Sequence, residues 1–211
     1  MRIVNLLMAL LLACSATIAT ADQTDKRLEA LFARLKETKT PDVARSVTSK
    51  IWSIWLHSGH RLSDELMRRG VTAMRTGRHN LALKQFELLV KHEPKFAEGW
   101  NKRATVLYVM GKFQSSIEDI KRVLVLEPRH FGALSSLGMS YEALGEEEAA
   151  RDAYKLALNA NPHLSRIGEK IESLQESVSQ KNIHNNGNIL KNGTIYPINF
   201  DFPLKFGLVG I

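Results

Sequence analysis

Apolar residues in the first part of the chain recur every three or four positions, the spacing of amphipathic helices. One such segment covers about 24–38, and its apolar residues are Leu28, Leu31, Phe32 and Leu35. A second begins at Thr40-Pro41, an N-cap followed by proline in the first turn, and ends near Gly59. We expect the two helices to form an N-terminal helical hairpin over 22–60 that covers the open end of the array described next.

Two tryptophans, Trp52 and Trp55, lie on the second of these helices. They fit a binding surface, or they fit the hydrophobic core where the hairpin meets the rest of the chain. Large aromatic side chains at helical spacing are usually core, so we predict the second role.

The pattern then repeats over 61–164 with a period of 34 residues. The residues in register are Gly77, Gly111 and Gly145, followed by Pro94, Pro128 and Pro162. A fixed period of this size is typical of stacked helix–turn–helix units. In each unit the glycine separates two helices, and the proline ends the second because it donates no N–H and disfavours helix in the residue before it.

Small residues also share slots from unit to unit. The first slot holds Gly70, Ala104 and Gly138, and the second holds Ala82, Ser116 and Ala150. Small side chains let two helix backbones approach closely while large neighbours fill the adjoining holes. This alternation predicts how the helical hairpins stack.

These residues resemble the tetratricopeptide repeat (TPR) family. The third repeat matches the family pattern best, at Leu134, Leu137-Gly138, Tyr141, Ala150, Tyr154 and Pro162. The first repeat departs most, with Arg69 where leucine is usual and Ala73 where tyrosine is. The resemblance implies an all-α solenoid of three helical hairpins.

The chain beyond the third repeat divides into a helix and a tail. Apolar residues at Ile167, Ile171, Leu174 and Val178 predict a capping helix over 165–180. The asparagine-rich stretch that follows predicts a flexible tail over 181–211. Near its end Phe200, Phe202, Leu204 and Phe206 alternate with other residues as in a strand. This segment either docks on the array or a partner, or it is a disordered apolar end.

Residues 1–21 have the pattern of a signal peptide. Arg2 precedes an apolar stretch, and Ala19-Thr20-Ala21 offers small residues for cleavage before Asp22. We therefore expect an exported, periplasmic protein. In the alternative, Leu11-Leu12-Ala13-Cys14 resembles a lipobox, and a lipid on Cys14, the only cysteine, anchors the chain to a membrane.

Charge and motifs restrict the function. The formal net charge of +7 favours anionic partners, but the charge is scattered along the chain and the export signal argues against nucleic acid. The sequence has no HExxH motif, cysteine cluster, phosphate-binding glycine loop or GxSxG motif. We expect neither an enzyme nor a metal or cofactor site.

The remaining candidate site is implied by the resemblance, in which the first helix of each repeat lines a concave groove. The groove residues are Met67, Arg68, Val71, Met74, Arg75, Asn101, Lys102, Thr105, Tyr108 and Met139. Methionines with Tyr108 would form an adaptable apolar floor, the basic residues a positive rim, and Asn101 a hydrogen-bonding group for an extended backbone. Such a groove suits a peptide with apolar side chains and an acidic residue or free carboxylate.

One subtype of the family clamps the C-terminal carboxylate of cytosolic chaperones with Lys, Asn and Arg side chains. The corresponding positions here are Met67, Val71, Gly132 and Ser136. None of these side chains carries a charge or an amide, which argues against that mode.

We therefore expect a periplasmic interaction module or scaffold that binds a peptide segment of an envelope partner. The alternative is a chaperone-like factor for exported clients such as apocytochromes or outer-membrane proteins. An adaptor holds one partner, whereas a chaperone binds many unfolded chains.

Overall fold

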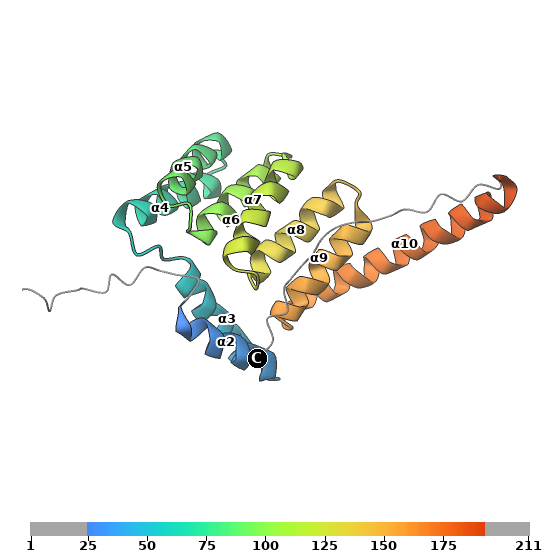
Figure 1. Cartoon of the computed structure of the whole chain (residues 1–211), viewed down its shortest axis with the longest axis horizontal. Helices are drawn as coiled ribbons and strands as arrows, with labels where there is room; N and C mark the ends of the chain where they lie inside the picture. The colour runs from blue at the N-terminus through green and yellow to red at the C-terminus, as the bar shows by residue number, and fades with distance from the viewer. Residues whose placement is uncertain (1–24, 193–211) are drawn as a thin grey trace, which may run out of the picture.

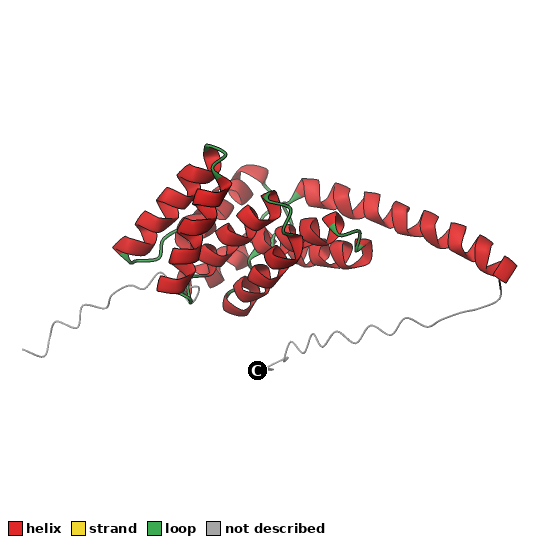
Figure 2. Cartoon of the chain, turned by 90° about the horizontal axis from the view of Figure 1, so that it is seen from above, coloured by secondary structure: helices red, strands yellow, loops and turns green. Residues whose placement is uncertain are grey.

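The computed structural model describes residues 25–192, and every regular element in this range is a helix (Figures 1 and 2). The helices are α2 (Lys26–Glu37), α3 (Pro41–Trp55), α4 (Arg61–Arg75), α5 (His79–His92), α6 (Ala97–Val109), α7 (Phe113–Leu126), α8 (Phe131–Ala143), α9 (Glu147–Ala160) and α10 (Ser165–Asn192). The signal peptide, Cys14 and the strand-like segment lie outside the described residues, so the predictions made on them stay predictions.

The predicted repeats are the pairs α4–α5, α6–α7 and α8–α9. The glycine between the helices of each pair has a positive φ, of 69° at Gly77, 73° at Gly111 and 77° at Gly145. At the first of these turns the Arg78 backbone N–H donates to the Ala73 carbonyl (2.9 Å), which closes the helix end. Glycine adopts this left-handed conformation without steric cost. The predicted all-α solenoid is confirmed.

The small-residue slots bring the helices of a pair into close contact. A Cβ at Gly70 would lie 2.4 Å from the Phe86 ring, and one at Gly138 would lie 2.4 Å from the Tyr154 ring. In the second repeat the Ser116 hydroxyl donates to the carbonyl of Ala104 (2.9 Å). The slots therefore fix how the two helices of each hairpin pack against each other.

Helix α10 covers the last repeat, as expected of a cap. Ile171 and Leu174 share a buried cluster with Ala150 and Tyr154. The helix does not end near Gln180 but continues to Asn192, and its second half projects away from the array (Figures 1 and 2). Once packing has fixed the first turns, adding residues to a helix costs less than starting one, which explains the extension. No helix within 25–192 is long and apolar enough to cross a membrane.

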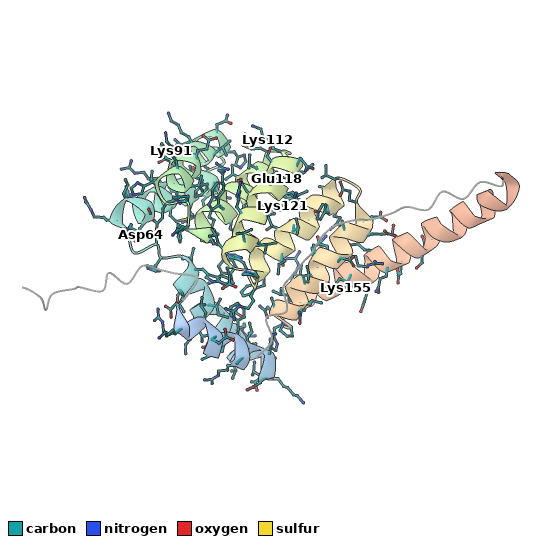
Figure 3. All side chains as sticks on the ribbon, in the orientation of Figure 1. Asp64, Lys91, Lys112, Glu118, Lys121 and Lys155 are labelled. Atoms are coloured by element: carbon teal, nitrogen blue, oxygen red, sulfur yellow. The ribbon has the colours of Figure 1, made fainter. Side chains whose placement is uncertain are left out.

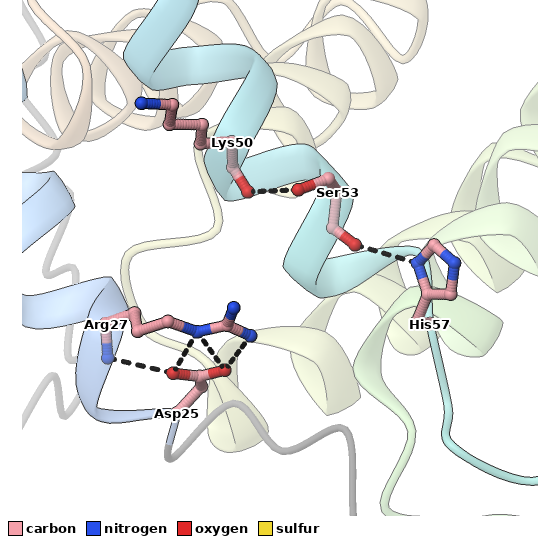
Figure 4. A network of polar contacts seen from close by, with 5 residues as sticks. All are labelled: Asp25, Arg27, Lys50, Ser53 and His57. Atoms are coloured by element: carbon pink, nitrogen blue, oxygen red, sulfur yellow. Dashed lines mark hydrogen bonds and ion pairs between the residues drawn. The ribbon is translucent and has the colours of Figure 1, made fainter. Parts of the chain in front are cut away.

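Helices α2 and α3 form the predicted N-terminal hairpin. Local polar contacts lie at the start of α2 and at the end of α3 (Figure 4). The Asp25 side chain accepts the Arg27 backbone N–H (2.8 Å) and caps α2. At the end of α3 a ring nitrogen of His57 lies 2.9 Å from the Ser53 carbonyl. Thr40 precedes α3 but makes no side-chain capping bond.

The position of this hairpin corrects our prediction. It does not cover the open end at α4, but packs against the α7–α8 loop and the two helices of the third repeat (Figure 1). Its buried residues share one cluster with Phe131, Leu134, Ala157 and Ala160. In the same region Arg129 donates to Glu29 (2.7 Å), and a ring nitrogen of His163 lies 3.0 Å from the Leu35 carbonyl.

The outward stripe of α4, at the open end of the array, is exposed to water. Leu62 is 53% exposed and the Arg69 side chain 60%. On the corresponding stripe of the second repeat, Phe96 and Val106 are only 1% and 0% exposed, because they pack against the first repeat. The second repeat also carries arginine in the slot of Arg69, at Arg103, where it pairs with Asp119. Arg69 is exposed because the array ends at α4 and no neighbour covers the stripe.

The two tryptophans belong to the core, as predicted. Trp55 is 1% exposed, and its ring lies 5.9 Å from Phe32 and 5.0 Å from Phe131, centroid to centroid. Trp52 is partly buried against the same cluster. Each large side chain buried in this way contributes about 1.5–3 kcal/mol to stability, so the hairpin is firmly joined to the third repeat.

Candidate partner-binding groove

Helix α6 lies beside α4 on one side and beside α8 on the other. The family resemblance assigns these three first helices of the repeats to the inner face of the array. Equivalent residues, 34 positions apart, form rows that cross these three helices. We call the rows nearer the C-terminal ends of the helices the open strip. The open strip consists of Val71, Met74, Arg75, Thr105, Tyr108, Val109, Met139 and Ala143, all at least partly exposed. Glu142 follows Met74 and Tyr108 in its row and borders the strip.

Part of the inner face of α6 and α8 lies beneath the hairpin. A Cβ at Gly132 would lie 2.7 Å from Cη2 of Trp52, so the indole rests directly on the α8 backbone. The Lys102 ammonium lies 5.6 Å from the centroid of the Trp52 ring. The hairpin therefore covers the beginnings of α6 and α8.

A buried polar network supports this contact. Glu98 and His130 are both fully buried. The carboxylate of Glu98 accepts from Nε2 of His130 (3.0 Å) and Nδ2 of Asn101 (2.9 Å), and Lys102 Nζ lies 2.8 Å from it. Nδ1 of His130 accepts the Ala133 backbone N–H (3.1 Å) and so caps α8, which leaves the ring proton on Nε2.

Burial alone would raise the pKa of the Glu98 carboxyl. The hydrogen bond from His130 and the charge of Lys102 outweigh this effect and hold the pKa below its ordinary value. The carboxylate is therefore ionised at neutral pH and keeps Lys102 paired.

Two of the predicted groove residues are not accessible to a partner. Met67 is 6% exposed and packs in the core of the first repeat. Asn101 is 4% exposed, and its amide donates to Glu98. The family pattern places both on the inner face but does not show which neighbours cover them.

The predicted positive rim is largely neutralised within the chain. Lys102 pairs with Glu98, and Arg68 donates to Glu65 (2.8 and 2.9 Å). Arg75 is exposed and has no ion-pair partner in the described part of the chain. One cation of the three is therefore available to a ligand.

Apart from Arg75 and Thr105, the open strip is apolar. Val71 and Met74 pack partly against the core of the first repeat, and Met139 packs partly against the cluster under α10. Tyr108 lies 5.4 Å from Phe113, centroid to centroid, and Val109 is 51% exposed. Each of these side chains is thus partly packed against its neighbours and partly accessible to a ligand.

A second polar cluster borders the strip on α8. The Tyr154 hydroxyl donates to Glu142 (2.7 Å), and Lys170 of α10 donates to both oxygens of the same carboxylate (2.9 and 2.7 Å). Burial opposes ionisation, yet the bonds from Lys170 and Tyr154 lower the pKa of Glu142. The family pattern does not show these contacts, because Lys170 belongs to a separate helix beyond the repeats.

The remaining titratable groups do not converge on a site. His57 contacts Ser53, whereas Nε2 of His60 lies 3.6 Å from Glu93. Within residues 25–192, no group of three His, Cys, Asp or Glu side chains is placed to hold a metal ion. Lys91 and Lys112 lie on the side of the array away from the hairpin (Figure 3).

Comparison with known proteins agrees with this architecture. The family model "Tetratricopeptide repeat" matches residues 101–165. A TPR repeat-containing protein of Rhizobium etli is 34% identical over 154 residues, which are 73% of this chain and 76% of that protein. The chain belongs to the tetratricopeptide repeat family, whose folds are in general non-enzymatic protein-interaction modules.

Two solved structures share the fold. The TPR domain of Sgt2 from Aspergillus fumigatus gives a TM-score of 0.56 at 19% identity, over 67% of this chain and 90% of that one. The first TPR domain of Spaghetti (RPAP3), bound to an HSP90 peptide, gives 0.55 at 18% identity, over 56% and 94%. At these identities the likeness concerns the fold alone.

Proposed function

We propose that this protein is a periplasmic interaction module that binds a peptide segment of an envelope protein on the open strip. The observation that carries the proposal is accessible apolar surface on the inner helices, to which Met74, Tyr108 and Val109 contribute. An apolar strip of this kind takes apolar side chains, and methionine adapts to irregular ones.

The structural relatives support a peptide as the ligand. The Spaghetti domain was solved with an HSP90 peptide in place. The ligand chemistry proposed here differs, because Val71 and Ser136 stand where the carboxylate-clamping subtype uses charged or amide side chains. In addition, Gly132 lies under Trp52 and is not available.

The proposed compartment rests on the signal-peptide pattern of residues 1–21. Mass spectrometry of the mature protein tests it, and a chain that begins at Asp22 in the periplasmic fraction is the expected result. A lipid-modified Cys14 at the N-terminus would instead place the module on a membrane surface.

Photo-crosslinking in living cells tests the binding site. A photoreactive residue in place of Tyr108 should capture one dominant envelope protein. The same residue in place of Leu88, which is 46% exposed on the outer helix α5, is the matched control and should not capture it. Many unrelated exported chains at Tyr108 would indicate a chaperone, and equal capture at both positions would contradict the site.

A further inference from the structure

We infer that the N-terminal hairpin is a fixed wall of the groove, which confines the partner to the open strip and selects a short apolar segment with one carboxylate against Arg75. This inference rests on the proposed function, since it specifies which half of the same groove binds and what it recognises.

The wall is fixed because its contacts belong to the core. The Trp52 indole fills the space over Gly132, and Trp55 stacks on His130. Moving the hairpin aside would expose Trp55 and Phe131, which are 1% and 2% exposed. A peptide that binds on the strip does not replace these contacts, so it cannot displace the hairpin.

The charges select the partner's acidic group. Lys102 is held between Glu98 and Trp52, and Arg68 is held by Glu65. Arg75 stands at the end of α4, exposed and without an ion pair in the described residues. A carboxylate on the partner can therefore form a charge-assisted hydrogen bond with Arg75, at the α4 end of the strip.

The width of the inner face sets the length of the segment. Neighbouring packed helices lie about 8–10 Å apart, so the axes of the first and third helix are roughly 16–20 Å apart. An extended segment advances about 3.3 Å per residue, and about five or six residues therefore suffice.

Peptides selected from a phage-displayed library of random 12-residue sequences, panned on the full chain, provide the probe. Fluorescence polarisation then gives the affinity of one selected peptide for the wild type and for two matched variants, Arg75→Met and Lys102→Met. We expect Arg75→Met to weaken binding at least tenfold and Lys102→Met to change it less than twofold. Acidic residues should also be enriched at one position of the selected peptides.

Two other outcomes overturn the inference in different ways. If Lys102→Met weakens binding as much as Arg75→Met, the partner reaches beneath the hairpin and the wall does not exist. If neither variant nor Tyr108→Ala affects binding, the peptide lies outside the groove and the proposed function fails as well. Lys102→Arg keeps the pairing with Glu98 and should bind like the wild type, which controls for a loss of fold in Lys102→Met.

Discussion

The indole ring of Trp55 stacks on the imidazole ring of His130, with centroids 4.1 Å apart and planes inclined by 11°. The same imidazole caps α8 and donates to Glu98 of α6. One histidine thus connects the N-terminal hairpin, the third repeat and the second repeat. The place of the hairpin on the groove follows from this connection.

Removing the stacked indole should loosen the hairpin. Trp55→Ala deletes a side chain that is 1% exposed, and we expect the free energy of unfolding to fall by about 3–5 kcal/mol. Leu56→Ala, next to it but 38% exposed, should cost less than about 1 kcal/mol. Urea unfolding of both variants measures the difference, and equal losses would contradict the position of the hairpin.

The buried Glu98 predicts a loss of stability in acid. Since its pKa is lowered in the folded state, the ionised carboxylate stabilises the fold above its ordinary pKa of 4.5, and this contribution disappears as the pH falls through the lowered value. The stability difference between the wild type and Glu98→Gln should therefore shrink below pH 4.5. Unfolding free energies measured between pH 7 and pH 3 test this, and a difference that grows in acid would contradict it.

Two glycines provide a matched test of the helix packing. A Cβ at Gly138 meets the Tyr154 ring at 2.4 Å, so Gly138→Ala should destabilise the fold by about 1–3 kcal/mol. A Cβ at Gly168 in α10 meets nothing within 4 Å, so Gly168→Ala should stabilise it by up to about 1 kcal/mol. Opposite shifts in thermal unfolding are expected, and a neutral Gly138→Ala would refute the close approach.

Arg69 and Arg103 occupy the same slot in the first and second repeats, where the family usually has leucine. Substitution by leucine should change the unfolding midpoint differently at the two positions. Arg69→Leu changes an exposed side chain and should leave the unfolding midpoint within about 2 °C. Arg103→Leu removes the partner of Asp119, whose side chain is 6% exposed, and should lower the midpoint by about 5 °C or more. If both variants behave alike, the open end is covered in solution.

The repeats were predictable because their determinants are local. A glycine such as Gly111 ends one helix and a proline such as Pro128 ends the next, and the fixed period repeats the test three times. The capping helix followed from its apolar face in the same way. Its true end at Asn192 did not, because the asparagine-rich sequence beyond Gln180 lacks the apolar periodicity that marked the helix.

The position of the hairpin was not predictable from periodicity, which shows that a face is buried but not against what. One residue could have indicated the contact. His130, in register with the buried Phe96, points to a buried polar contact at the third repeat. Arg69 gives no such indication, because Arg103 occupies the same slot in the second repeat, inside the array. Family geometry places the candidate groove residues on the inner face. It does not show that Met67 and Asn101 are buried, because their burial depends on neighbouring side chains that only the structure shows.

The most direct test of the central claim is the affinity of the double variant Met74→Ala, Tyr108→Ala for the partner that crosslinking identifies. Binding on the open strip predicts a loss of about 2 kcal/mol or more. The unfolding midpoint should change far less than in Gly138→Ala, because both residues are only partly buried. Unchanged affinity in a correctly folded double variant would show that the groove is not the binding site.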